Sequence, residues 1–329
     1  MASGEALFNP YLPEFHADLQ PGKPPLLRVA SAGDAARWAA EHRAALRALV
    51  AEHGSLLVRG LGLRDATETG AVFRQLGRLL TETEAFAPRQ RYAEGVYSSS
   101  KWPPNQQMCM HHELSYALEV PSLMLFACLV APTTGGATPV ADAAAVLEAL
   151  PPDLVERFER LGWLLIRNYN DDIGASFADA FGTGDRNAIE SYCRAHAIRF
   201  EWQEGSALRT WQRRSAIVAH PLTGRWCWFN QIAFLNEWTL APELREYLVD
   251  VYGSDGLPFS TSFGNGDPIG PDVIQVINEV YDANTLREAW QAGDLLLVDN
   301  LRTAHGREPF GSPREVVVAL ADPVRTTGS

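Results

Sequence analysis

The stretch MHHELSY, residues 110–116, combines two histidines and a glutamate in three consecutive positions. In an extended segment the side chains at i and i+2 point the same way, so His111 and Glu113 could reach one ion while His112 faces away. Two histidines and one carboxylate on one face of an ion, with the other face open, are the ligands of non-haem Fe(II) oxygenases. The His-x-Glu pattern alone is common, however, and an ordinary polar loop edge would also explain it.

A third ligand has to come from another part of the chain. Of the eight histidines, His305 has the most suitable setting, because it follows the apolar run LLLVDN and precedes a glycine. A metal ligand at the end of a barrel strand would have such neighbours. His42, His53 and His196 lie on or beside expected helices among charged residues, and His220 lies in the turn-like sequence HPLTGR.

Arg314 and Thr138 form a second set of candidates, for a carboxylate. Arg314 follows the GREPFGSP turn, so an antiparallel return strand would bring it back beside His305. The planar guanidinium suits a carboxylate, because two parallel hydrogen bonds fix both position and orientation. Thr138, in GGATP, could add a hydroxyl donor from a neighbouring strand. The pair predicts a site for a dicarboxylate such as 2-oxoglutarate, although either residue alone would be a surface ion pair or a turn residue.

Composition narrows the class of protein. The 329 residues carry a formal net charge of −12 and have a pI of about 5.2, which argues against a nucleic-acid partner. No apolar run approaches the length of a membrane span, and the N-terminus lacks the pattern of a signal peptide. The four cysteines form no Cys-x-x-Cys pair. We therefore expect a cytoplasmic protein with a small-molecule substrate; the sequence does not predict an oligomeric state.

The order of expected elements favours one domain, 1–329, that is mostly β with flanking helices. Short strands and turns fill 95–142, and further strands are expected at 55–61, 293–300 and 314–322 and in AIVAHP and WCWFNQ. Such strands fit a barrel or jelly roll better than a doubly wound sheet. An N-terminal arm with flanking helices is expected over 1–85, and a helical insertion, a candidate lid, over 150–215. Helices are expected at 34–54, 65–80, 151–162, 185–196, 241–251 and 270–282.

The sequence also resembles a known family, the taurine-dioxygenase-like (TauD/TfdA) Fe(II)/2-oxoglutarate-dependent oxygenases, and most nearly its branch of syringomycin-type amino-acid hydroxylases. The matching stretches are MHHELSY, GGATPVADAAAV, HPLTGRWCWFNQ, WQAGDLLLVDNLRTAHGREPFGSPREVVVALAD and, less distinctively, FADAFGTGDRNAIESYC. They occur in family order over roughly residues 85–322. The resemblance implies a double-stranded β-helix, which is a cupin-like jelly-roll barrel.

The resemblance also implies roles for particular residues. His111, Glu113 and His305 would bind Fe(II), and Arg314 with Thr138 would hold the distal carboxylate of 2-oxoglutarate. Gln107 matches a position that can touch this co-substrate in relatives. His112 stands where the branch often has Asn, so it would lie near the substrate, behind the ligands, or in the core.

The implied reaction consumes O2 and 2-oxoglutarate, releases succinate and CO2, and hydroxylates a C–H bond. The implied substrate is an amino acid or a molecule derived from one, free or tethered to a carrier protein, in specialised metabolism. Related halogenases have a small residue in place of Glu113, so chlorination is not expected here. Desaturation, cyclisation and epoxidation use the same ligands and stay open.

Further polar and aromatic residues are candidates for lining the substrate pocket: His112, Arg89, Arg91, Lys101, Trp102, Arg209, Trp211, Asn230 and Gln231. Two other classes of protein compete with the oxygenase. A non-redox metal-binding jelly roll would need no carboxylate anchor such as Arg314. A zinc hydrolase would need a general base beside the metal, and the helical His-Glu-x-x-His spacing is absent.

Overall fold

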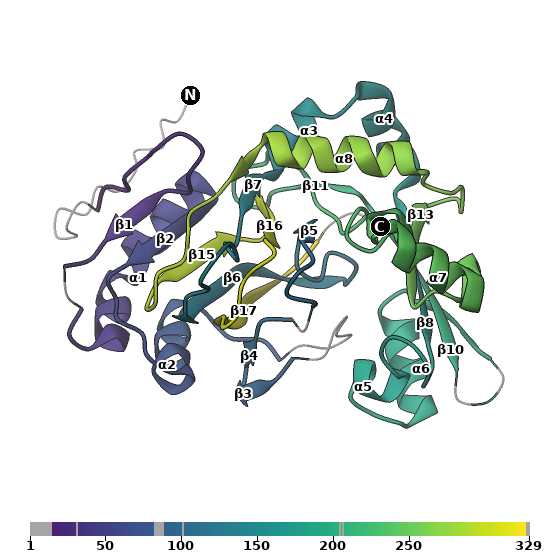
Figure 1. Cartoon of the computed structure of the whole chain (residues 1–329), viewed down its shortest axis with the longest axis horizontal. Coiled ribbons are helices and arrows are strands. Elements are labelled where there is room, and N and C mark those ends of the chain that lie inside the picture. Colours follow the sequence, from purple (N-terminus) through teal and green to yellow (C-terminus); the bar gives the residue numbers. More distant parts are fainter. Residues whose placement is uncertain are drawn as a thin grey trace, which may run out of the picture.

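Two β-sheets form the centre of the protein in the computed structural model, which describes residues 15–30, 32–81, 89–100, 102–203, 205 and 207–326 (Figure 1). The strands of the larger sheet are, in spatial order, β1 (Leu26–Arg28), β2 (Ser55–Arg59), β15 (Leu295–Asp299), β6 (Glu119–Val130), β17 (Glu315–Arg325), β4 (Val96–Ser98) and β3 (Arg91–Ala93). Those of the smaller sheet are β14 (Thr285–Leu286), β7 (Val140–Asp142), β16 (Thr303–Arg307) and β5 (Met108–His111).

The larger sheet is buried on both faces. Along β17, Val316 and Val318 join the apolar core that also holds side chains of the smaller sheet, whereas Val317 and Ala319 join a second core beneath α1 and α2. This alternation follows from the two-residue repeat of a β-strand. Helices α1 (Ala35–His53) and α2 (Ala66–Leu76) therefore cover the outer face of the sheet and leave its inner face for the smaller sheet (Figure 1).

The ends of α1 match the sequence prediction. The Asp34 side chain accepts a hydrogen bond from the Arg37 amide, which satisfies a backbone group that the first helical turn leaves unpaired. Gly54 ends the helix with a φ of 83°, a conformation that favours glycine. A Cβ at this position would collide with Thr303 Oγ1, so glycine lets the end of α1 lie against the start of β16.

The middle of the chain departs from the expected helical insertion. Residues 150–215 contain helices, but they also contain three strands of a separate four-stranded sheet, ordered β13-β8-β10-β9. The stretch WLLIRNY in β8 alternates buried and half-buried residues, which is the repeat of a strand with one covered face. These strands are β8 (Trp163–Tyr169), β9 (Arg199–Trp202), β10 (Leu208–Arg214) and β13 (Phe259–Phe263).

The other expected elements are confirmed within a few residues at their ends. The four later helices predicted by the sequence are α4 (Pro152–Leu161), α6 (Arg186–Ala195), α7 (Pro242–Tyr252) and α8 (Pro271–Ala283). The strands expected in AIVAHP and WCWFNQ are β11 (Ile217–Ala219) and β12 (Trp226–Trp228). The structure adds α3 (Ala143–Ala149), α5 (Phe177–Phe181) and two short 3₁₀ helices (Glu237–Thr239 and Ser254–Gly256). None of the helices in the described ranges has the length and apolar character needed to cross a membrane.

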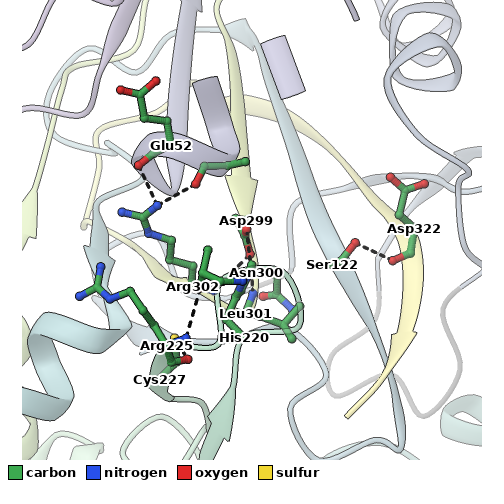
Figure 2. Close-up of polar contacts among 12 residues, drawn as sticks. Glu52, Ser122, His220, Arg225, Cys227, Asp299, Asn300, Leu301, Arg302 and Asp322 are labelled. Atoms are coloured by element: carbon green, nitrogen blue, oxygen red, sulfur yellow. Dashed lines mark hydrogen bonds and ion pairs between the residues drawn. The ribbon is translucent and has the colours of Figure 1, made fainter. Parts of the chain in front are cut away.

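A network of hydrogen bonds fixes the turn between β15 and β16 (Figure 2). Asp299 Oδ1 accepts from the amides of Leu301 and Arg302, and Asp299 Oδ2 lies 3.0 Å from His220 Nε2. Arg302 donates to the backbone carbonyls of Ala51 and Glu52 at the end of α1, both at 2.8 Å. The turn is thus tied both to the helix that covers the sheet and to the loop after β11.

Asn300, in the same turn, connects it to the segment after β5. Its side-chain oxygen accepts from the Glu113 amide at 2.8 Å, and its side-chain nitrogen donates to the carbonyls of Glu113 and Pro121 at 3.0 and 2.9 Å. Asn300 is fully buried, so no water replaces these bonds if the side chain is removed. This amide therefore holds the backbone of Glu113 against the start of β16.

We expect Asn300→Ala to lower the free energy of unfolding by roughly 2–4 kcal/mol, because the substitution leaves buried backbone groups of Glu113 and Pro121 unpaired. Chemical denaturation of the metal-free protein measures the change. Asn105→Ala, which truncates an exposed asparagine, is the matched control and should alter stability by less than about 0.5 kcal/mol. Equal stabilities of the two variants would contradict the role assigned to Asn300.

Candidate metal centre

Strand pairing brings the candidate ligands together. β5 and β16 are antiparallel neighbours with His111 directly opposite His305, and Glu113 follows β5 after one residue. One nitrogen or oxygen atom from each of these three buried residues lies within 4.8 Å of the corresponding atoms of the other two. Glu113 Oε2 is 3.9 Å from His305 Nε2. Two imidazoles and a carboxylate in this arrangement fit a divalent iron ion.

Both candidate histidines are in the protonation state that a metal requires. Burial lowers the pKa of His111 and lowers that of His305 well below its usual value, so both rings are neutral at neutral pH. His111 Nδ1 donates to the Cys109 carbonyl at 2.8 Å, which leaves Nε2 as the atom with an available lone pair. Phe234 stacks on the His111 ring at 4.5 Å between centroids and limits its rotation.

Arg314 and Thr138 lie in the same cavity as the three candidate ligands. Arg314 Nε donates to the Gly136 carbonyl at 3.0 Å, and one of its terminal nitrogens is 3.5 Å from Thr138 Oγ1. Trp290 Nε1 donates to the same hydroxyl oxygen at 3.2 Å. Burial lowers the pKa of Arg314 to about 10, so the group remains a cation at neutral pH. The structure brings together the two residues that the sequence suggested for a carboxylate.

The cavity contains two further arginines. Arg89, a substrate candidate from the sequence, donates to Glu113 Oε2 at 3.0 Å and to Ser100 Oγ at 3.1 Å. Sequence reasoning missed Arg307, which is 5% exposed and donates to the carbonyls of Trp102, Pro103 and Gln106. Its position two residues after His305 on one strand was a usable signal, because such residues share a face.

His112 lies on the side opposite the metal cavity. Its Nδ1 lies 2.6 Å from the Asn300 carbonyl, its ring packs on Phe229, and burial lowers its pKa to about 4. Asn230 supports the same region, since its carbonyl accepts from the His112 amide and its side chain binds the Ala216 carbonyl. Gln231 is also buried beside this segment. These three substrate candidates lie in the core behind the ligands.

The remaining candidates lie away from the cavity. Gln107 and Trp102 line a second cavity, together with Cys109 of β5, Tyr281 of α8 and residues just before α7. Arg209 and Trp211 stack on each other in the third sheet, where Arg209 also pairs with Asp255. Arg91 is exposed on β3, and Lys101 falls outside the described residues. We therefore do not assign these residues to the metal cavity.

Comparison with known proteins bears on the chemistry of this site. The sequence profile of the taurine catabolism dioxygenase TauD, TfdA family matches residues 19–320. The dapdiamide synthesis protein DdaC of Enterobacter agglomerans is 35% identical over 277 residues, which cover 84% of each chain. A clavaminate synthase-like protein of Arabidopsis thaliana is 29% identical over 287 residues, covering 84% of this chain and 83% of the relative.

Solved structures share the fold at low sequence identity. A taurine dioxygenase from Burkholderia xenovorans superposes with a TM-score of 0.56 at 15% identity, covering 96% of this chain and 95% of the other. PvcB, described as an Fe, alpha-ketoglutarate dependent oxygenase from an isonitrile synthetic pathway, gives a TM-score of 0.52 at 18% identity, with 94% and 90% coverage. The chain belongs to the TauD/TfdA family and is a non-haem Fe(II)- and 2-oxoglutarate-dependent dioxygenase that uses O2.

Proposed function

We propose that the enzyme hydroxylates a C–H bond of an amino acid or an amino-acid-derived molecule, with release of succinate and CO2. His111, Glu113 and His305 hold Fe(II), and the two central sheets form the double-stranded β-helix that positions them. The observation that carries the proposal is the convergence of these three side chains within 4.8 Å, in one cavity with a buried arginine and a threonine hydroxyl. We treat residues 1–329 as one oxygenase domain.

The iron ion supplies the activation of O2, and the side chains around it supply position and exclusion of water. Arg314 and Thr138 bind the distal carboxylate of 2-oxoglutarate, which places the other end of that molecule toward His111 and His305. Phe126, Val316 and Val318 line the cavity with apolar surface. Such surface strengthens the charged contacts and keeps solvent from the reacting atoms.

Two relatives support a role in specialised metabolism. One is a dapdiamide synthesis protein, and the other is an oxygenase from an isonitrile synthetic pathway. The substrate class rests on this likeness, and delivery on a carrier protein is a variant of the same proposal. Desaturation, cyclisation and epoxidation are alternative outcomes with the same ligands. Product mass spectrometry with labelled O2 divides these outcomes into two groups, because hydroxylation and epoxidation each add one oxygen atom, whereas desaturation and cyclisation each remove two hydrogen atoms and add none. Within each group, NMR spectroscopy of the product identifies the new bond.

The first test is anaerobic. Fe(II) and 2-oxoglutarate added to the metal-free protein should give the weak visible charge-transfer band of a chelated 2-oxo acid. Arg314→Ala should need at least about thirtyfold more 2-oxoglutarate, because one partner of a buried charged pair is lost. Arg325→Ala removes an exposed arginine of the same strand and should behave as the wild type. Absence of the band with iron shown to be bound would contradict the proposal.

The Thr138 hydroxyl gives a finer test of the co-substrate site. Thr138→Val, which keeps the shape but removes the hydroxyl, should weaken 2-oxoglutarate binding by up to about tenfold, the value of a neutral hydrogen bond. Thr138→Ser should restore most of that loss. Titration of the same visible band measures both variants. Equal affinities of the valine and serine variants would exclude a hydrogen bond from this hydroxyl.

A further inference from the structure

A buried indole lies behind the Thr138 hydroxyl. Trp290 is 7% exposed, and its Nε1 lies 3.2 Å from Thr138 Oγ1, whereas Thr138 itself lines the metal cavity. Trp290 is not one of the residues that line this cavity within the described part of the chain. Any effect of its N–H group on a molecule in the cavity is therefore exerted through Thr138.

The two hydrogen bonds to Thr138 Oγ1 both have a fixed direction. An indole N–H group and a guanidinium can only donate, whereas a hydroxyl has one proton to donate and two lone pairs that accept. Trp290 Nε1 at 3.2 Å and the terminal nitrogen of Arg314 at 3.5 Å therefore both use the oxygen of Thr138 as an acceptor. Among the described residues no group accepts the hydroxyl proton, which is left for a molecule in the cavity.

The indole is held in place by hydrogen bonds on both sides of Trp290. The Ala289 carbonyl accepts from Arg59 at 2.8 Å, and the Gln291 amide donates to Asp294 Oδ2 at 2.8 Å. Arg59 and Asp294 are themselves joined by a buried ion pair at 2.9 Å. This pair ties the loop that carries Trp290 to β2, so the position of the N–H donor is set before any ligand binds.

We propose that Trp290 is a positioning residue that keeps Thr138 a hydrogen-bond donor to the cavity, and that it thereby selects a distal carboxylate over a carboxamide. The inference rests on the proposed function, in which Thr138 and Arg314 bind this end of the co-substrate. A carboxylate accepts from both groups. A carboxamide has one acceptor oxygen, so its NH2 group faces one of the two donors and stays unpaired in a buried site.

A double-mutant cycle tests the path through Thr138. In the anaerobic titration of the visible band, Trp290→Phe should need about fivefold more 2-oxoglutarate, because the hydroxyl is free to turn and its bond to the carboxylate is no longer preorganised. In the Thr138→Val background the same change should alter the affinity by less than about twofold. Trp163→Phe changes a buried tryptophan of the third sheet and is the matched control, with wild-type affinity expected. No loss in the wild-type background, or equal losses in both backgrounds, would overturn the proposal.

The second experiment measures selectivity. N-oxalylglycine and its primary amide, N-oxalylglycinamide, share one chelating end and differ only in the distal group, and each is titrated until it displaces 2-oxoglutarate from the band. Trp290→Phe should lower the preference for the acid at least about threefold, because the freed hydroxyl can accept from the amide NH2 while Arg314 binds the amide carbonyl. Trp163→Phe should keep the wild-type preference. A wild-type preference in Trp290→Phe would contradict the role assigned to the indole.

A measurement on the native side chain covers the case in which Trp290→Phe does not fold. The indole N–H signals of the nine tryptophans are followed by NMR spectroscopy of isotope-labelled protein, with Zn(II) in place of iron. The signal that Thr138→Val shifts to higher field should move to lower field when 2-oxoglutarate is added to the wild type, because a hydroxyl that donates is also a better acceptor. If that signal does not move while calorimetry shows 2-oxoglutarate bound, the proposal is wrong.

These outcomes are distinct from a failure of the proposed function. If the wild type gives no band with Fe(II) bound, or if Thr138→Val binds 2-oxoglutarate as tightly as the wild type, the co-substrate site is wrong and the inference falls with it. If both results are as expected but the cycle shows no coupling between Trp290 and Thr138, Trp290 has no positioning role and the oxygenase assignment stands.

Discussion

The side chain of Asn300 joins the two chain segments that carry the candidate metal ligands. It holds the amide and carbonyl of Glu113 from the turn that leads into β16, and β16 carries His305. The Asn300 carbonyl also accepts from the ring of His112, which keeps that histidine turned away from the cavity. Because these groups are buried, the network has one satisfied arrangement, and that arrangement places Glu113 beside His305. The spacing of ligands nearly two hundred residues apart in the chain therefore depends on one amide and on the pairing of β5 with β16.

The second constraint on the site is electrostatic. Burial places three arginines in a cavity whose only described carboxylate is Glu113. The arginine side chains favour acidic small molecules in this cavity, whereas Glu113 and the two neutral histidines are the groups suited to a divalent ion. The acidic exterior implied by a net charge of −12 does not prevent this, because low-dielectric walls separate the cavity from surface charge. Recognition of a dicarboxylate co-substrate would thus use positive charge that lies inside the cavity.

Local spacing accounts for what the sequence predicted well. The i, i+2 relation selected His111 and Glu113 over His112, and the helix expected over 34–54 is α1, with Asp34 and Gly54 as its caps. The pairing of strands that are distant in the sequence could not be predicted in the same way, because no local pattern indicates that His305 lies opposite His111. Arg89 lines the metal cavity, and Gln107, just before β5, lines the second cavity. The local sequence around either residue does not indicate which cavity it enters. The stretch WLLIRNY lies in the region expected to be helical, although the alternation of its buried and half-buried residues is typical of a strand.

The account depends most on the claim that His111, Glu113 and His305 hold the metal while Arg314 holds the co-substrate. A crystal structure with Mn(II) and N-oxalylglycine tests it directly, since anomalous scattering locates the metal without reference to the protein atoms. We predict one anomalous peak within bonding distance of the three side chains, and the distal carboxylate of N-oxalylglycine on Arg314 and Thr138. A peak that lacks any of the three ligands, or a carboxylate held by Arg307 or Arg89 in place of Arg314, would contradict the account.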